Sequence, residues 1–383
     1  MRPRQALPIL FLGAVAVTAY GCDDFQSAQH EAATVPAPPP TTAATPAATA
    51  AATTPAPDPA APAQQPIVAA MTPAADSPMA RSIESAQAGG AAPAKAAPSP
   101  LLIKVEVLLD RAHFSPGVID GRSGLNLTNA LAAFAKARGG AGAGTVDGAA
   151  LAALPAEDKG AITQSYTITA EDEAGPFIGK VPDGFEAQSK LDKLGYTDPA
   201  QGLAAKFHMS ETLLKALNPG ADFGTAGTSL VVVQPSMAPL PGVARVEVDK
   251  AANQVRAFDG GGKMVAAFPA TVGSTERPAP SGELTVKSST PDPDYTYDPT
   301  KLTFGPRSKG KLTIKPGPNN PVGSTWIALS LATYGIHGSP DPAKVGKAAS
   351  HGCVRLTNWD ATALGKAVSK GTPVVFVGET TKT

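Results

Sequence analysis

The stretch YGIHGSPDPAKVGKAASHGCVRL, Tyr334–Leu356, decides which fold and which chemistry we expect from this chain. It contains His337, His351 and Cys353, which are two of the five histidines and one of the two cysteines. A thiol is a good nucleophile only as the thiolate, and a neighbouring imidazole can take its proton. Gly352 allows backbone N–H groups to approach the oxyanion formed when a thiol attacks a carbonyl. The stretch therefore predicts an enzyme that transfers acyl groups through Cys353.

The charge balance of the chain argues against a nucleic-acid partner. The 383 residues include 32 basic and 32 acidic side chains. No basic run carries the interleaved aromatic residues that are typical of nucleic-acid binding. The length is sufficient for two or three small domains. We therefore expect a multidomain protein that binds no nucleic acid.

The first 21 residues resemble a secretory signal peptide. Arg2 and Arg4 precede the apolar run LPILFLGAVAVTAY, which is too short to span a bilayer stably. Cys22 follows Ala-Tyr-Gly, which resembles a bacterial lipoprotein cleavage site. These features predict an exported protein of the periplasm or cell envelope. Cys22 is either lipidated, as an N-terminal membrane anchor, or absent from a soluble mature protein.

Residues 22–100 are expected to form a disordered linker. The segment is rich in proline, alanine and threonine and poor in aromatic and branched aliphatic side chains. Such a composition buries too little apolar surface to offset the entropy of ordering the chain. Proline-rich chains extend by roughly 3 Å per residue, so the linker could act as a spacer between an anchor and a distant polymer.

Two small modules are expected after the linker. Residues 101–157 contain two amphipathic helical patterns around the turn SPGVIDG, followed by the short helical pattern TVDGAALAAL. The stretch LLDRAHFSPGVIDGRSGLNLTNALAAF resembles a three-helix peptidoglycan-binding module. Residues 158–236 begin with the strand-like SYTITAED and end with helix, turn and strand patterns. Their second half resembles a LysM module, with the insertion GPFIGKVPDGFEAQSKLDKLGY in place of the first helix. His208 is expected to be a satisfied, partly buried side chain.

Residues 243–378 are expected to form a mainly β domain. RVEVD and QVRAF alternate apolar and polar residues, and GELTVKSS, KLTIKP and TWIALS indicate further strands. One clear helical pattern, DATALGKAVSKG, follows the cysteine, and PVVFV is a last buried strand. The expected architecture is a β-sandwich-like catalytic domain with one or two helices. It follows a small α-helical module and a small α+β LysM-like module.

The C-terminal motifs resemble those of the YkuD-type L,D-transpeptidase family. The resemblance spans roughly residues 243–377 and includes PSGEL, PGPNNPVGSTWIALSLATYGIHG, HGSP, SHGCVRL and TNWDA. It implies a cysteine that attacks the carbonyl between the third residue and D-alanine of a peptidoglycan stem tetrapeptide. The acyl group then passes to an amine of another stem, giving a 3→3 crosslink, or to a protein lysine or a D-amino acid. Peptidoglycan biosynthesis, cell-wall organisation and cell shape are the processes implied, and no cofactor or metal is needed.

The resemblance also implies roles for individual residues. Cys353 would be the nucleophile, and His337 the general base and later acid, oriented by the carbonyl of Gly338. The N–H groups of Gly352 and Cys353 would bind the oxyanion, and His351 would shape the loop. Ser350, Tyr334 and Arg355 are expected to contact substrate. Arg355 suits a stem carboxylate; the alternative is a salt bridge within the domain, for example to Asp360. Trp326 is expected in the core.

Other interpretations of the same residues are weaker. His337, His351 and Cys353 could bind zinc, but no fourth ligand at a recognisable spacing completes such a site. In papain-like and NlpC/P60 peptidases the cysteine precedes the histidine, the reverse of the order here. Sortases share this order but lack the SHGC run.

Two alternatives to transpeptidation stay open from sequence alone. The same thiol chemistry with water as acceptor would make an L,D-carboxypeptidase, because the shape and dryness of the cleft decide the acceptor. A catalytically inert domain would leave a peptidoglycan-binding scaffold, in which the two upstream modules bind glycan strands. The presence of both Cys353 and His337 argues against this scaffold.

Overall fold

The computed structural model describes residues 77–87, 97–140, 153–154, 158–273, 278–300, 310–347 and 352–379. The expected signal peptide, Cys22 and the linker up to residue 76 lie outside these ranges. Among the helices that are described, none is long and apolar enough to cross a membrane. All described residues belong to one compact unit, Pro66–Thr383.

The C-terminal part of the chain is built on a nine-stranded sheet with the order β5-β4-β3-β13-β7-β10-β11-β12-β6. Its strands are β3 (Arg245–Asp249), β4 (Gln254–Phe258), β5 (Met264–Pro269), β6 (Thr271–Val272), β7 (Gly282–Pro291), β10 (Thr325–Leu329), β11 (Gly335–His337), β12 (Val354–Arg355) and β13 (Pro373–Val377). Burial alternates along β3 and β10, as a sheet with one face in a core requires. The expected mainly β fold is confirmed.

One strand, β7, pairs with neighbours in both halves of the sheet, and the two edge strands of the sheet lie next to each other in sequence. The long strand β7 pairs with β13 over its first residues and with β10 over the rest. The two edge strands, β5 and β6, are separated in sequence only by Ala270. Since neighbouring residues are about 3.8 Å apart, the two edges of the sheet must adjoin. This closure gives the sandwich-like shape expected from the sequence. A separate two-stranded sheet pairs β8 (Tyr295–Tyr297) with β9 (Leu312–Ile314).

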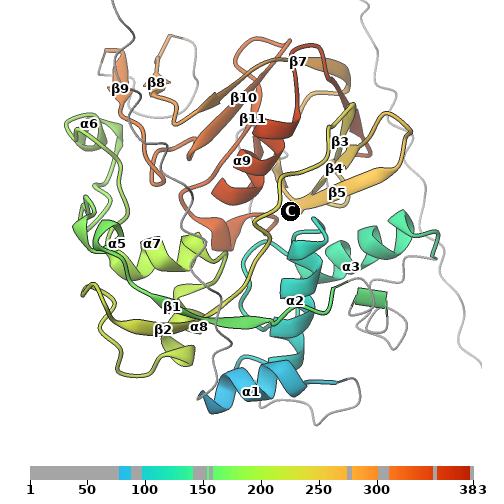
Figure 1. Ribbon diagram of the computed structural model, residues 1–383. Coiled ribbons are helices and arrows are strands. Elements are labelled where there is room, and N and C mark those ends of the chain that lie inside the picture. The colour runs from blue at the N-terminus through green and yellow to red at the C-terminus, as the bar shows by residue number, and fades with distance from the viewer. Residues whose placement is uncertain are drawn as a thin grey trace, which may run out of the picture. The chain divides into compact units, whose positions relative to one another are not determined.

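Helix α9 (Asn358–Ala367) covers one face of β7, β10 and β11 (Figure 1). The Thr357 hydroxyl caps it by accepting the Asp360 N–H. A Cβ on Gly365 would lie 2.7 Å from Ser289 Oγ and 2.8 Å from Thr325 Cγ2, so the helix approaches the strands closely. A 3₁₀ turn, η1 (Pro342–Lys344), follows β11. The opposite face of β10 and β11 is left for the candidate site.

Helix α1 (Pro78–Ser85) shows that the expected disorder of the whole segment 22–100 is wrong for these residues. Ser77 caps the helix and Pro78 occupies its first turn, where its missing N–H is not needed. Ile83 is 0% exposed and belongs to a core that also contains side chains of the next helix, α2 (Pro100–Arg111). Ala80 is also buried, and Met79 packs against the same core. The helix is ordered because distant parts of the chain bury these side chains, and the average composition of the segment does not predict such contacts.

The next two helices, α2 (Pro100–Arg111) and α3 (Leu125–Ala137), form the expected helical pair. The buried Glu106 carboxylate closes the connecting turn by accepting the N–H groups of Asp120 at 3.0 Å and Gly121 at 2.8 Å. Most of the expected third helix lies outside the described residues.

Residues 158–236 have the expected order of strand, helices and strand. Strand β1 (Thr163–Thr167) pairs antiparallel with β2 (Ser229–Val233), and four helices lie between them in sequence. The helices of this part are α5 (Ala170–Ala174), α6 (Phe185–Gln188), α7 (Pro199–Lys206) and α8 (Glu211–Leu217). The insertion runs between α5 and α7 and contains α6.

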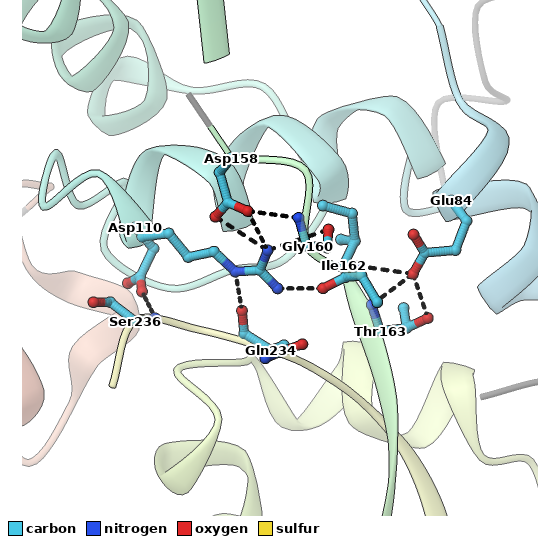
Figure 2. Close-up of polar contacts among 10 residues, drawn as sticks. Glu84, Asp110, Asp158, Gly160, Ile162, Thr163, Gln234 and Ser236 are labelled. Atoms are coloured by element: carbon cyan, nitrogen blue, oxygen red, sulfur yellow. Dashed lines mark hydrogen bonds and ion pairs between the residues drawn. The ribbon is translucent and has the colours of Figure 1, made fainter. Parts of the chain in front are cut away.

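Charged side chains of helices α1 and α2 form hydrogen bonds and an ion pair with residues 158–236, as Figure 2 shows. Glu84 of α1 accepts the backbone N–H of Thr163 at 2.7 Å and its hydroxyl at 2.8 Å. Arg111 of α2 donates to Gln234 O at 2.7 Å and pairs with Asp158 at 3.2 Å. Because these bonds join residues far apart in sequence, the two parts pack as one body.

A buried polar cluster joins both upstream parts to α9. His208 Nδ1 lies 3.0 Å from Asp110 Oδ2, and its ring stacks on Trp359 at 4.9 Å. The Ser115 hydroxyl donates to Asp360 Oδ2 at 3.0 Å. His208 is thus hydrogen-bonded and half-buried, as expected from the sequence.

The cluster predicts a pH-dependent stability. Burial raises the pKa of Asp360 to about 7, with Asp110 adding to the effect, and Thr357, His208 and Ser115 opposing it. A raised carboxyl pKa stabilises the folded state at acid pH, and this stability is lost as the pH rises through about 7. We expect Asp360→Asn to gain roughly 2 to 4 kcal/mol over wild type at about pH 8, with little gain near pH 4.

Urea unfolding of both proteins between about pH 4 and about pH 8 measures this difference. Asp183→Asn is the matched control, since Asp183 is 94% exposed in its pair with Lys180 and should change nothing. Parallel stability curves for wild type and Asp360→Asn would contradict the prediction.

Candidate active site

The pairing of β11 with β12 brings the predicted site residues together. These strands are parallel, with Ile336 opposite Val354 and His337 opposite Arg355. Side chains of paired residues, and of residues two apart, lie on the same face of a sheet. Cys353 directly precedes β12. The register therefore places Cys353, Arg355 and His337 on one face, opposite the face that α9 covers.

His337 is held as a neutral imidazole. It is 4% exposed, and its Nδ1 lies 2.7 Å from the carbonyl oxygen of Gly338. Burial lowers the pKa of His337 to about 4, and Arg355 lowers it further, while the carbonyls of Gly338 and Val322 oppose these effects. Since a carbonyl can only accept, Nδ1 carries the proton and Nε2 has a lone pair. The imidazole can therefore act as a base at neutral pH.

Asn358 fixes the backbone that holds His337. Its Oδ1 accepts the Ser324 N–H at 3.1 Å, and its Nδ2 donates to Pro318 O at 3.0 Å. A Cβ on Gly338 would lie 2.2 Å from Asn358 Oδ1, and one on Gly323 would lie 2.1 Å from it. Both positions must be glycine for this approach. The first turn of α9 thus positions the carbonyl that binds the imidazole.

Cys353 lies against a strained turn. Its thiol donates to Thr333 O at 3.7 Å, and Thr333 has a φ of 67°. A β-branched residue rarely adopts this left-handed conformation, which clusters at functional sites. Burial raises the pKa of Cys353 above its ordinary value, while the backbone N–H of Gly335 and the charge of Arg355 oppose the rise. At neutral pH the thiol is therefore mostly protonated.

Gly352 and Tyr334 pack against each other beside the thiol. Gly352 has a φ of 106°, which residues with a Cβ rarely adopt. A Cβ at this position would also lie 3.3 Å from the Tyr334 ring. The loop before Cys353 can follow this path because residue 352 is glycine.

Arg355 makes no ion pair with any described residue, and its buried Nε has no hydrogen-bond partner among them. The expected alternative, a salt bridge from Arg355 to Asp360, is wrong. Asp360 lies in α9, where it is buried and its carboxylate accepts a hydrogen bond from the Ser115 hydroxyl. Arg355 instead interacts electrostatically with Cys353 and Tyr295. Burial raises the pKa of Tyr295 to about 12, with Cys353 and Tyr297 adding to the rise and Arg355 opposing it.

Two predicted residues, Ser350 and His351, lie outside the described residues, so their positions relative to Cys353 stay predictions. Three other residues near the site were not found from sequence. They are Tyr295, Asn358 and Trp326, which was expected in the core. Trp326 is half-buried, pairs with His337 across β10 and β11, and stacks on its ring at 5.4 Å. The strand alternation around TWIALS was a usable signal, because it places Trp326 opposite the core-facing Ile327.

The pKa directions at the site predict how the thiol reacts. Because Cys353 and His337 are both neutral at pH 7, we expect iodoacetamide to alkylate Cys353 slowly at this pH. The rate should rise roughly tenfold per pH unit up to about pH 9, following the thiolate fraction. Mass spectrometry of the full chain over this range measures the rate.

His337→Gln is the control for this experiment. Its alkylation profile should have the same shape as that of wild type, since the imidazole does not stabilise a thiolate at rest. A rate that is constant between about pH 5 and about pH 8 would indicate a thiolate–imidazolium pair and contradict the prediction.

Comparisons with known proteins identify the family of the C-terminal part of the chain. The YkuD family, the L,D-transpeptidase catalytic domain, matches residues 244–376. YkuD of Bacillus licheniformis, named as an L,D-transpeptidase, is 28% identical over 179 residues, which are 45% of this chain and 90% of that protein. YqjB of Bacillus subtilis, also named as an L,D-transpeptidase, is 30% identical over 147 residues, which are 37% of this chain and 75% of that protein.

A solved structure, L,D-transpeptidase 3 of Mycobacterium tuberculosis, is 17% identical and has a TM-score of 0.30, covering 40% of this chain and 76% of that one. Fold and site together define a mainly β domain that carries a cysteine and a buried histidine on one face of its sheet. The chain belongs to the L,D-transpeptidase family of the YkuD type, and it is an enzyme of that type.

Proposed function

We propose that this protein is an exported L,D-transpeptidase that forms a Cys353 acyl-enzyme with peptidoglycan stem tetrapeptides and transfers the acyl group to an amine. The observation that carries the proposal is the register of β11 and β12, which sets Cys353 and the neutral His337 on one face. Membership of a family that acts on stem peptides supports the substrate class.

In the first half of the reaction, Cys353 Sγ attacks the carbonyl carbon between the third stem residue and D-alanine. Nε2 of His337 takes the thiol proton as the carbon–sulfur bond forms, so no thiolate is needed beforehand. The C–N bond then breaks, and the imidazolium gives its proton to the departing nitrogen of D-alanine. A thioester and a neutral imidazole remain.

In the second half, an amine attacks the thioester carbonyl. His337 takes a proton from the attacking nitrogen, the C–S bond breaks, and the proton returns to sulfur. An amine of a second stem gives a 3→3 crosslink, and a protein lysine or a D-amino acid gives an attachment. Water in place of the amine would give tripeptide, which is the carboxypeptidase alternative.

Backbone and side-chain groups around Cys353 would stabilise these steps. The N–H groups of Gly352 and Cys353 are proposed to bind the oxyanion, each lowering the barrier by about 3 kcal/mol if well aligned. Arg355, which has no carboxylate partner among the described residues, is proposed to bind a stem carboxylate. Tyr334 lies against Gly352 and would border the substrate. Ser350 and His351 are proposed to shape the loop before Cys353.

The upstream parts are proposed to direct the enzyme to the cell envelope. The proposal comprises a signal peptide over residues 1–21, a helical peptidoglycan-binding-like module over 101–157 and a LysM-like module over 158–236. The antiparallel pairing of β1 with β2, and the two helices α7 and α8 that precede β2, support the LysM-like part of the proposal. A lipid at Cys22 would add a membrane anchor.

The test is the intact mass of the purified protein after mixing with a disaccharide-tetrapeptide, alone and with excess acceptor stem. An acyl adduct on Cys353 followed by a crosslinked dimer is the expected result. An adduct that resolves only to tripeptide would replace transpeptidation by carboxypeptidase activity. Neither adduct nor product, from protein with a titratable thiol, would favour the scaffold.

A further inference from the structure

The insertion between α5 and α7, residues 175–196, is hydrogen-bonded to the catalytic domain. The Leu194 N–H donates to Pro316 O at 2.8 Å, and the Asn319 N–H donates to Leu194 O at 3.0 Å. The Asn319 side chain donates to Gly195 O at 2.7 Å. A Cβ on Gly317 would lie 2.1 Å from Leu194 O, so glycine is required for this approach. The insertion therefore holds a fixed position on the loop that precedes β10.

Helix α6, within the insertion, packs against an aromatic residue of the candidate active site. The Phe185 ring lies 5.5 Å from that of Tyr295 and 5.1 Å from that of Tyr297. Tyr295 in turn interacts electrostatically with Cys353 and Arg355. The upstream insertion thus reaches the neighbourhood of the nucleophile.

A groove of about 410 Å³ lies between the insertion and the catalytic domain. Val181, Phe185 and Gln188 line it from the insertion. The catalytic domain contributes Asn319, Asp341, Lys344 and Arg355 to its lining, among other residues. One part of this groove is therefore made by residues that are outside the catalytic domain in sequence.

The polar groups of the groove indicate what it can bind. Lys344 is paired with Asp341 at 2.8 Å, but Arg355 has no ion-pair partner among the described residues. Gln188 donates through Nε2 to Pro182 O at 3.0 Å, while its buried Oε1 has no partner in this part of the chain. A guanidinium suits a carboxylate, and an amide oxygen suits an N–H donor. A peptide with a free carboxylate carries both.

We propose that this groove is a subsite for a peptide carboxylate, with Arg355 binding the carboxylate and α6 supplying a specificity-determining wall through Phe185 and Gln188. The inference rests on the proposed function for the identity of the peptide, a stem tetrapeptide. It assigns the upstream insertion a direct part in substrate selection. Gln188 accepts an N–H of the peptide, and Phe185 packs against its backbone or side chains.

Calorimetric binding to the full chain with Cys353→Ala tests this subsite without turnover. The probes are a stem tetrapeptide and the same peptide with its carboxylates converted to carboxamides. We expect Gln188→Ala to weaken binding of the tetrapeptide about 3- to 10-fold, which is the net value of one hydrogen bond. Gln188→Glu keeps an acceptor but adds a negative charge, so it should weaken the carboxylate probe more than the carboxamide probe. Arg355→Gln should remove the preference for the carboxylate.

Lys190→Ala is the matched control, because Lys190 is exposed on the same segment and does not line the groove. It should bind both probes as the parent protein does. Equal affinity of the parent and Gln188→Glu for both probes would overturn the proposal. If Gln188→Glu lowered the affinity for both probes equally, the proposal would also be overturned, because a purely structural role of α6 would affect the carboxylate and carboxamide probes alike.

Kinetics separate this proposal from the proposed function. With the thiol present, Gln188→Ala should raise KM about 3- to 10-fold and leave kcat nearly unchanged. If wild type forms no acyl adduct but the binding pattern holds, the transferase proposal fails and the subsite stands. If wild type turns over and Gln188→Ala has the KM of wild type, the subsite fails and the transferase proposal stands.

Discussion

Cys353→Ala is expected to lower crosslink formation at least about 10⁴-fold, because alanine has no thiol that could form the acyl-enzyme. The substitution should leave the fold intact. The hydrogen bond from the thiol to Thr333 O is long, at 3.7 Å, and alanine fits any backbone conformation that cysteine adopts. Product formation from disaccharide-tetrapeptide, measured by chromatography, gives the rate.

Two controls show whether such a loss is chemical. The Cys353→Ala protein should bind the stem tetrapeptide as wild type does and should unfold at the same urea concentration. Cys353→Ser should be equally inactive, since a hydroxyl keeps its proton far more strongly than a thiol, and the imidazole is a weak base with a pKa of about 4. Crosslinking within about tenfold of wild type in the alanine variant would exclude Cys353 as the nucleophile.

The second large effect is expected from His337→Gln, which should lower kcat by a factor of about 10² to 10⁴, the usual contribution of a general base. Glutamine retains a side-chain N–H for the carbonyl of Gly338 but has no basic nitrogen for the thiol proton. The loss should shrink above about pH 9, because the raised pKa of Cys353 then allows a thiolate to form without a base.

The pH profile of wild type is the companion measurement. Since the pKa of His337 is about 4, kcat/KM should stay nearly constant down to about pH 5 and fall as the imidazole becomes protonated below it. A profile that falls already near pH 6.5 would mean that the imidazole is more basic than its burial implies. An unchanged kcat in His337→Gln at pH 7 would remove His337 from the mechanism.

The local elements were predictable because short-range patterns determine them. The alternation in RVEVD and QVRAF gave β3 and β4, and the helical pattern after TNWDA gave α9. The pairing of those strands into one curled sheet was not predictable residue by residue. It depends on contacts such as Val246 with Val374, which lie far apart in the chain.

Errors arose where distant contacts decide a local outcome. Ile83 stabilises α1 by packing into a core, and the surrounding proline-rich sequence does not predict this packing. Trp326 looked like a core residue because aromatic side chains on strands usually are, yet its register opposite His337 places it on the site face. Asp360 looked like a partner for Arg355, but its helix faces the other side of the sheet and meets Ser115.

The sequence by itself indicated the kind of chemistry, because a thiol, an imidazole and a glycine in one short motif are typical of thiol acyl transfer. It also determined the mainly β class and the family. Only the tertiary structure decided that His337 is neutral, since burial sets its pKa, and that Arg355 lacks an ion-pair partner among the described residues. The fold also places Phe185 and Gln188 in the same groove as Arg355, although Arg355 lies more than a hundred residues further along the chain.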